Sequence, residues 1–493
     1  MSTEKKSFGQ IITSYPKSFW VASAMELFER WAWYGLFAVL ALYLTGSTDE
    51  GALGFTHTEK GQIMGIVTAI LYLLPLFTGV IADKIGYKLS LIIAYVMLIS
   101  GYYFMGEVSS YANVFLVFLY VAVGAAIFKP VASAIITKST DESNSTLGFG
   151  IFYMMVNIGG FIGPAFSSTL RTQYGWKLVF IQAAVVIFIN LLIVIFFFKE
   201  PDRVIKKESF SEAISSSLKK IWEAILDIRL TVLLVIMVGF WTMFNQLFYT
   251  LPTFIEDWVD TKSLHDKIAS FWPWLAKTMS GGGDSVNPEW LINIDAGAIV
   301  LLQILVSYYV MKMRHVSAMI TGFIVASIGI GITFYTGNGL YTILGIVIFA
   351  IGEMMTNPTF SSFIAIISPK GKEALYQGTY FLPIALGNLF TTFISGNLYD
   401  AWSDKLSLLR TEMSNRAIEM PSISQEFTKN DYFTMASEKL GMTQDEMTQM
   451  VWSTYQPNKI WYVIVGIGAV TILALFVYDR WVVRPKEKQA ETS

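Results

Sequence analysis

The chain has 493 residues, of which 54% are apolar, 15% aromatic and only 15% charged, and its mean hydropathy is +0.52. Soluble domains carry about 25% charged residues, so this composition argues against a water-soluble enzyme. The net charge of -2 argues against a nucleic-acid partner. The sequence has no cysteine, which excludes disulfides and thiolate metal sites. We therefore predict a polytopic integral membrane protein.

Apolar stretches about as long as a membrane-crossing helix recur along the whole chain. Six of them precede a polar segment and six follow it. The first six lie near 17–45, 59–82, 87–108, 111–137, 147–170 and 176–198. The other six lie near 229–256, 290–312, 315–336, 340–367, 374–399 and 457–482. This pattern predicts an all-α membrane protein of about twelve helices in two six-helix bundles, with a substrate site between them near the midplane.

The predicted organisation has three parts: a first bundle over residues 1–198, an amphipathic linker over 199–228, and a second bundle over 229–493. The second bundle contains two unusually long loops, 259–288 and 401–456. Loops of this length are commonly either functional or disordered, and the sequence leaves both interpretations open.

Basic residues cluster on one side of the predicted bundles. They occur in the linker and in the turns and tail that share its side, at Lys84, Lys88, Lys199, Lys206, Lys207, Lys219, Lys220, Arg229, Lys312, Arg314, Lys370, Lys372, Arg484, Lys486 and Lys488. Loops on the opposite side are more acidic, as at Asp49–Glu50 and Glu256–Asp257. The positive-inside rule then predicts a multi-pass protein of the plasma (inner) membrane with both termini in the cytoplasm.

Ionisable residues inside the apolar spans are the main functional signal, because such groups are costly in a membrane and generally mark a pathway or a partner. Glu26, Glu29 and Arg30 are spaced to share one face of the first span. Lys129 precedes Pro130 in the fourth span, and Glu353 lies in the tenth with no obvious partner in its own half. We favour function over a structural ion pair for these residues. Asp295, near the end of span eight, is equally consistent with a hydrated position.

Other chemistry has weaker support. Trp33, Tyr34, Tyr72, Tyr153 and Trp241 could line a cavity, although packing is the default role of aromatic residues in a bundle. The three histidines, His57, His265 and His315, fall in or beside loops, so we expect surface residues and no metal site. The sequence has no HExxH motif and no comparable nucleophile arrangement, so we expect no enzyme.

Several motifs resemble a known family. GVIADKIGYK, from Gly79 to Lys88, resembles the short loop signature of the major facilitator superfamily. ELFERWAWYG from Glu26 to Gly35 and FGIFYMMVNIGGFIGP from Phe149 to Pro164 are similar to two signatures of the proton-dependent oligopeptide transporters. Phe128-Lys129-Pro130 and GEMMTNP from Gly352 to Pro358, followed by FLPIALGN, complete the set in the expected order.

The resemblance implies a proton-coupled symporter that imports di- and tripeptides by alternating access, as a monomer in membrane lipid, driven by the proton gradient without a cofactor. It implies proton coupling by Glu26, Glu29, Arg30 and Lys129. It also implies that Arg30 and Lys129 face the peptide carboxylate and that Glu353 holds the amino group. The expected pocket includes Tyr34, Tyr72, Tyr153, Asn157, Trp241, Asn245 and Asp295, and a conformational latch is expected at Asp83, Lys84 and Lys88.

The chain also departs from the family pattern. Phe37 and Asn245 stand where the family usually has an Arg and an acid that pair across the two halves, and Asp295–Ala296 replaces an Asn-Pro. Trp31 and Trp33 replace Phe and Tyr, which predicts a narrower cavity. These changes keep a second hypothesis open, a proton-coupled transporter of a non-peptide zwitterion, a peptide-like metabolite or a drug. A third hypothesis, of another class, is a non-transporting sensor or scaffold that presents the 401–456 loop to a partner.

Overall fold

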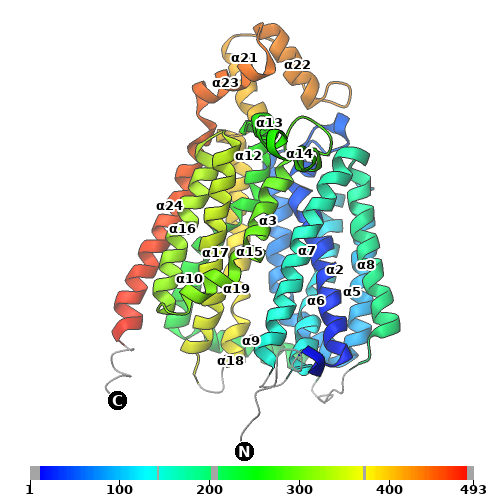
Figure 1. Cartoon of the computed structure of the whole chain (residues 1–493), viewed down its shortest axis with the longest axis vertical. Helices are drawn as coiled ribbons and strands as arrows, with labels where there is room; N and C mark the ends of the chain where they lie inside the picture. The colour runs from blue at the N-terminus through cyan, green and yellow to red at the C-terminus, as the bar shows by residue number, and fades with distance from the viewer. Residues whose placement is uncertain (1–11, 141–143, 201–208, 370–372, 486–493) are drawn as a thin grey trace, which may run out of the picture.

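A computed structural model describes residues 12–140, 144–200, 209–369 and 373–485, and these are almost entirely helical (Figure 1). Ten described helices are long and apolar enough to cross a membrane, or eleven if the bent pair α3 and α4 forms one span. The first long helix, α2 (Lys17–Thr45), is not among them, because Glu26, Glu29 and Arg30 lie in its middle. It occupies the remaining predicted span, so the predicted fold class is confirmed.

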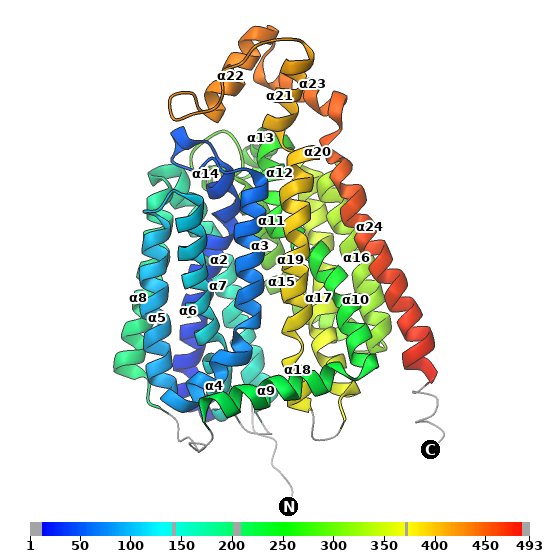
Figure 2. The same cartoon turned by 180° about the vertical axis from the view of Figure 1, so that it is seen from behind.

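The helices form two groups that lie side by side (Figures 1 and 2). The first group contains α2, α3 (His57–Leu73), α4 (Pro75–Ile85), α5 (Tyr87–Met105), α6 (Tyr111–Lys138), α7 (Ser145–Tyr174) and α8 (Trp176–Phe197). The second contains α10 (Ile228–Phe244), α11 (Gln246–Tyr249), α12 (Leu251–Trp258), α15 (Pro288–Val310), α16 (His315–Tyr335), α17 (Gly339–Ile367), α18 (Glu373–Gly378), α19 (Phe381–Phe393), α20 (Tyr399–Trp402) and α24 (Ile460–Tyr478).

Each group has its own hydrophobic core. One core runs from Tyr15 to Phe198 and adds Tyr249, while the other runs from Ala224 to Tyr478. Helices of this kind are apolar around much of their circumference, because one side packs in the bundle and the other faces lipid. Large side chains on the outer surface, such as Leu301 and Ile304 of α15, are accordingly more than four-fifths exposed.

Prolines shape the spans in two ways. Pro75 begins α4 directly after α3, and the two helices meet at an angle of 52°. Pro130 and Pro358, in contrast, lie inside α6 and α17, which continue through them. A proline removes one backbone donor and kinks or breaks a helix unless neighbouring groups compensate.

Helix α9 (Phe210–Ile225) crosses one end of both groups (Figure 2). It begins with a capping box in which Ser209 and Glu212 satisfy each other's backbone amides. The exposed Leu218 and Trp222 form part of its apolar side, so the predicted amphipathic linker is helical. Of the basic residues that predict orientation, Lys206, Lys207, Lys370, Lys372, Lys486 and Lys488 lie outside the described residues.

The two long loops, for which the sequence left function and disorder open, are largely helical at the opposite end of the molecule. Residues 259–288 contain α13 (Thr261–Phe271) and α14 (Pro273–Ser280). Residues 401–456 contain α21 (Lys405–Asn415), α22 (Lys429–Leu440) and α23 (Gln444–Tyr455), which together we call the cap (Figure 1). Capping boxes at Thr428 and Thr443 begin α22 and α23.

Glycines allow the closest helix crossings. A Cβ on Gly65 of α3 would lie only 2.9 Å from the backbone oxygen of Asn388 on α19, and still closer to the Thr392 hydroxyl. On α7, a Cβ on Gly163 would clash with the backbone oxygen of Trp31 on α2. Small residues let helix backbones approach in a membrane bundle. The first crossing joins the two groups, and the second holds the first group together.

Candidate functional site

A cavity of about 380 Å³ lies between the two groups of helices. This volume falls in the range typical of small-molecule sites. Aromatic rings and side-chain amides make up much of its lining, with Trp33, Tyr34, Phe37, Tyr72, Tyr153 and Asn157 from the first group and Trp241, Phe244, Asn245, Asn293, Asp295, Glu353, Asn357, Tyr380 and Asn388 from the second. Eight of the ten predicted substrate-binding residues therefore line one cavity.

The charged cluster predicted in the first group does assemble on α2. The Arg30 Nε atom lies 2.5 Å from a Glu29 carboxylate oxygen and 3.4 Å from Glu26 Oε1. All three side chains are buried, with Glu29 completely so. A buried charge pair is stable only when its geometry and remaining hydrogen bonds are good. Here one Glu29 oxygen, Oε1, accepts no hydrogen bond from the described residues, so the cluster is not fully satisfied.

Arg30 and Lys129, the other two predicted substrate-binding residues, do not line the cavity. The Arg30 guanidinium lies 5.7 Å from the Tyr34 ring centre, and the Lys129 ammonium lies 4.3 Å from that of Tyr72. Both tyrosines line the cavity, whereas the two cations pack against their rings. In this conformation the two tyrosines form the lining surface beside the cations, and a direct contact of either cation with a ligand stays a prediction. Such cation–π contacts are worth roughly 0.5–2 kcal/mol.

The second group places two acids in the cavity wall. Asp295 of α15 and Glu353 of α17 are only 5% and 9% exposed, and their carboxyl groups lie within hydrogen-bonding reach of each other. Asp295 therefore belongs to the cavity wall, about two turns inside α15. The expectation that Glu353 has no partner in its own half is wrong, because the neighbouring helix supplies one.

Several lining residues were not predicted. Tyr249 donates a 2.6 Å hydrogen bond to Asn388 Oδ1, and the Tyr380 hydroxyl bonds to Asn357 Oδ1. Asn293 donates to the Phe161 carbonyl across the two groups at 2.8 Å. Their sequence signal was an asparagine within an apolar span. A side-chain amide that is buried in a membrane needs hydrogen-bond partners, so such a residue could have been predicted to face other helices or a cavity.

The two residues that replace the family's salt bridge, Phe37 and Asn245, also line the cavity. Phe37 contacts the second group through rings, with centroids 5.6 Å from Tyr249 and 6.4 Å from Phe248. Aromatic pairs at this spacing contribute about 0.5–1.5 kcal/mol beyond their buried area. An apolar contact therefore joins the groups where the family pattern has an ion pair.

On the cap side of the cavity, polar contacts join the two groups. Arg171 at the end of α7 binds Glu289 of α15 with two hydrogen bonds of 2.5 and 3.2 Å, and Glu289 is completely buried. Lys60 of α3 donates a 2.9 Å bond to the Tyr249 carbonyl. Bidentate Arg–carboxylate pairs are among the stronger polar contacts. The molecule is therefore closed on this side.

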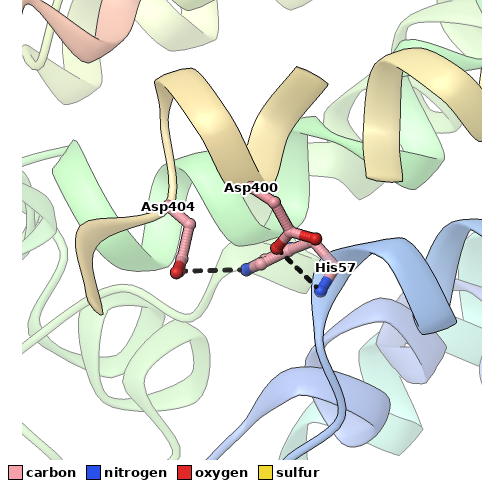
Figure 3. A group of neighbouring side chains, drawn as sticks. All are labelled: His57, Asp400 and Asp404. Atoms are coloured by element: carbon pink, nitrogen blue, oxygen red, sulfur yellow. Dashed lines mark hydrogen bonds and ion pairs between the residues drawn. The ribbon is translucent and has the colours of Figure 1, made fainter. Parts of the chain in front are cut away.

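His57 belongs to the same closure (Figure 3). Its Nε2 atom lies 3.3 Å from Asp404 Oδ1, while Asp400 accepts hydrogen bonds from the amides of His57 and Thr58. His57 is 4% exposed, so the expectation of a surface histidine is wrong. The reason is that α20, which contains Asp400, and the start of α21, which follows Asp404, cover the start of α3.

His57, Asp400 and Asp404 have side-chain atoms within 4.8 Å of one another, a spacing that a metal ion can bridge. Their surroundings do not suit a cation. The Lys60 ammonium lies 3.2 Å from His57 Nδ1, and both Asp400 oxygens already cap the start of α3. We therefore interpret the cluster as an interhelical polar contact that includes the amine of Lys60.

The predicted latch residues lie at the opposite end of the first group. Asp83 accepts a 3.3 Å hydrogen bond from the Tyr87 hydroxyl, and Lys88 donates to the carbonyls of Ile195 and Phe198. Lys84 precedes the end of α4 at Ile85. The contacts of Lys88 tie α5 to the end of α8 within the first group. A latch between conformations stays a prediction.

The cap rests on both groups through polar contacts. Asn430 donates 2.9 Å hydrogen bonds to Asp49 and Glu50 in the first outer loop. Burial alone would raise the pKa of Asp49, but hydrogen bonds from Ser47 and Asn430 hold it below its usual value. Burial likewise lowers the pKa of Lys429, but carboxylates led by Asp257 raise it above its usual value. Hydrogen bonds to the first outer loop and the attraction between Lys429 and nearby carboxylates therefore hold the cap against the two helix groups.

Known proteins resemble this chain in sequence and in fold. Residues 22–260 match the Major Facilitator Superfamily. Dipeptide and tripeptide permease B of Aliivibrio fischeri is 31% identical over 178 residues, which is 34% of each chain. Dipeptide and tripeptide permease A of Escherichia coli is 28% identical over 181 residues, 36% of this chain and 35% of the permease. The sequence match thus spans about a third of these relatives' length.

Solved structures match almost the whole chain. The peptide transporter POT in complex with sulfate superposes with a TM-score of 0.67 at 16% identity, covering 97% of both chains. A POT family transporter in complex with 5-aminolevulinic acid gives 0.65 at 18% identity, covering 96% of both. The nucleoside transporter NupG gives 0.68 at 11% identity, covering 94% of this chain and 99% of NupG. Structural likeness at such identities concerns the fold.

The described helices therefore have the fold of the major facilitator superfamily, and residues 22–260 match that superfamily in sequence. The predicted resemblance to the proton-dependent oligopeptide transporters is confirmed by the dipeptide and tripeptide permease relatives, and the solved POT structures share the fold.

Proposed function

We propose that the chain is a proton-coupled symporter that imports di- and tripeptides across the plasma (inner) membrane by alternating access. The relatives named as dipeptide and tripeptide permeases support peptide transport. One proton that crosses 100 mV carries about 2.3 kcal/mol, enough for roughly 50-fold accumulation of a neutral solute. Proton movement therefore suffices as the driving force, and we propose no cofactor.

The observation that carries this proposal is the division of charge across the cavity. The first group supplies Arg30 and Lys129 behind two tyrosine rings, and the second supplies Asp295 and Glu353 in the wall itself. A zwitterionic peptide placed between them directs its carboxylate toward the cations and its ammonium toward the acids. Such a ligand contacts both helix groups and couples its binding to their relative movement.

The contacts on the cap side support a place for this structure in the transport cycle. With the cap outside the cell and both termini in the cytoplasm, the Arg171–Glu289 pair and the His57–Asp404 contact close the outer side. Outward opening then requires these bonds to break. Rocking of two bundles around a central site is the general mechanism of such transporters.

Proton coupling is assigned to the α2 cluster and Lys129. Glu26 and Glu29 share the single guanidinium of Arg30, which makes a full contact with Glu29 and a longer one with Glu26. A carboxyl group next to such a cation can exchange its ion pair for a proton. We propose that Glu26, Glu29, Arg30 and Lys129 couple proton binding to the movement of the two groups.

A second candidate is transport of a non-peptide zwitterion. The acid at position 295 and the amide at position 245 favour it, since both change the polarity of the cavity wall relative to the family pattern. A structural neighbour of the POT family holds 5-aminolevulinic acid, which is not a peptide. The third hypothesis, a scaffold, draws on the ordered cap, but a scaffold has no use for buried ionisable groups in a central cavity.

Uptake of labelled dialanine into proteoliposomes tests the proposal. We expect accumulation under an inward proton gradient and its loss with a protonophore. Liposomes without protein provide the background. Absence of uptake by well-folded protein would contradict peptide import, and a thermal-shift screen of small zwitterions would then test the second candidate.

A further inference from the structure

Asp295 and Glu353 form a pair of acids in the wall of the central cavity. Asp295 lies on α15 and Glu353 on the neighbouring α17, and their carboxyl groups are within hydrogen-bonding reach of each other. Both side chains are at least nine-tenths buried. The position equivalent to Asp295 carries an asparagine in the family pattern, so the pairing is a feature of this chain.

The surroundings of the pair provide no positive charge. The described residues that line the cavity include no lysine and no arginine. The titratable groups that face the pair are the hydroxyls of Tyr34 on α2, Tyr153 on α7 and Tyr380 just before α19. In addition, Asp295 Oδ1 and Glu353 Oε2 are buried and accept no hydrogen bond from the described residues. The pair is therefore acidic, enclosed and incompletely satisfied.

Two facing carboxyl groups form a hydrogen bond only if one of them carries a proton, since an ionised carboxylate has no hydrogen to donate. Two like charges in contact also cannot both persist away from water without a cation. The unsatisfied oxygens add a second requirement, because a buried acceptor without a donor is costly. A group that brings several N–H donors and a positive charge meets both requirements.

We propose that Asp295 and Glu353 share one proton in the ligand-free protein, and that the primary ammonium group of a substrate replaces this proton. This inference rests on the proposed function, in which Glu353 holds the amino group, and adds to it the shared proton that the ammonium group displaces. The accepted substrates carry a protonated primary amine at the end that faces the second group. Solutes whose amine is acylated leave the pair without a donor and are rejected.

The exchange balances without any further reactant. The shared O–H bond breaks, the proton passes to water in the cavity, and the ammonium group keeps its three N–H bonds and donates them to the two carboxylates. Before the exchange the pair carries one negative charge. Afterwards it carries two, opposed by the single positive charge of the ammonium, so the total is unchanged.

The first test needs no ligand. Infrared spectroscopy of the protein in lipid nanodiscs follows the C=O band of protonated carboxyl groups as the pH changes. We expect the band of the wild-type protein to titrate in a different pH range from the bands of Asp295→Asn and Glu353→Gln, because either change removes the like-charged partner that shares the proton. Glu438→Gln, on an exposed position of α22, is the control. Identical titrations of the wild type and both pair variants would overturn the proposal.

The second test uses dialanine as the probe. In weakly buffered solution with a pH-indicator dye, we expect release of about one proton for each dialanine that binds to wild-type protein, and no comparable release with Asp295→Asn. Binding without proton release by the wild type would overturn the exchange. Absence of dialanine binding would instead count against the peptide transport proposed above, and the infrared titration would still decide whether the pair holds a proton.

Discussion

The two halves of the cavity hold their charges in different ways. In the first half, Glu26 and Glu29 share Arg30, and Lys129 lies against the Tyr72 ring, so positive and negative groups largely compensate one another. In the second half, Asp295 and Glu353 stand in the wall with no cation among the described lining residues. The first half can therefore be stable without a ligand, whereas the second half needs a proton or a cationic ligand to neutralise it.

This contrast separates two roles that a single pocket could have combined. The compensated cluster can move a proton by exchanging ion-pair partners. The uncompensated pair can recognise a ligand, because its need for a positive charge is met from outside. Variants of the α2 cluster should thus impair proton coupling, whereas variants of the Asp295–Glu353 pair should impair ligand recognition.

The largest expected effect comes from Lys129→Ala. The loss of the Lys129 cation should reduce proton-driven dialanine uptake by about tenfold or more, since its cation–π contact with Tyr72 is worth roughly 0.5–2 kcal/mol and it is assigned to proton coupling. Lys138→Ala is a matched control, because Lys138 lies on the same helix against the Tyr87 ring. Unchanged uptake by Lys129→Ala would remove this residue from the mechanism.

A steric change should break the contact between the halves without altering any charge. Gly65→Leu places carbon where Thr392 and the Asn388 backbone already lie, and such overpacking costs about 1–3 kcal/mol. We expect loss of uptake together with a lower Tm. Gly466→Leu serves as the control, since a Cβ at Gly466 meets nothing within 4 Å. Equal uptake by both variants would show that the α3–α19 crossing is dispensable.

Glu353→Gln should change selectivity more than turnover. Its amide still accepts a hydrogen bond but no longer offers a charge to an ammonium group. We expect a loss of affinity of about tenfold for dialanine and little change for N-acetyl-dialanine, in keeping with the value of a charge-assisted hydrogen bond. Competition against labelled substrate measures both compounds. Equal losses would show that Glu353 does not bind the amino end.

The smallest expected effect lies at the cap. The pKa of Asp49 is held below its usual value by the hydrogen bonds from Ser47 and Asn430. The docked carboxylate therefore stabilises the cap above the usual carboxyl pKa, and this contribution is lost as the pH falls through the lowered value. We expect lower protection against hydrogen exchange, relative to the intrinsic rate at each pH, in residues 428–440 at acidic than at neutral pH, and Asn430→Ala should show low protection at both. No difference between the variant and the wild type would contradict this docking contact.

The sequence predicted the helices and the ionisable residues well, for physical reasons that can be named. Apolar stretches of membrane length mark the spans, and Glu26, Glu29 and Arg30 meet because helical spacing alone brings them to one face. The folded cap was also partly readable, since Thr428 with Asp431 and Thr443 with Glu446 are capping signals.

The remaining features depend on contacts between helices. Neither the Asp295–Glu353 pair nor the tyrosine rings beside Arg30 and Lys129 follow from spacing along one span, because they depend on how each helix is rotated against its neighbours. The same holds for His57, whose burial results from residues more than 300 positions away along the chain, Asp400 and Asp404. The sequence determines these contacts, but they cannot be predicted from the residue pattern of any single span.

The most direct test of the account compares both ends of the ligand on wild-type protein. Dialanine, N-acetyl-dialanine and dialanine amide would compete against labelled dialanine in proteoliposomes under an inward proton gradient. If cations of the first half and acids of the second half hold one zwitterion between them, only the peptide with both ends free should compete strongly. Equal competition by either blocked form would contradict the account.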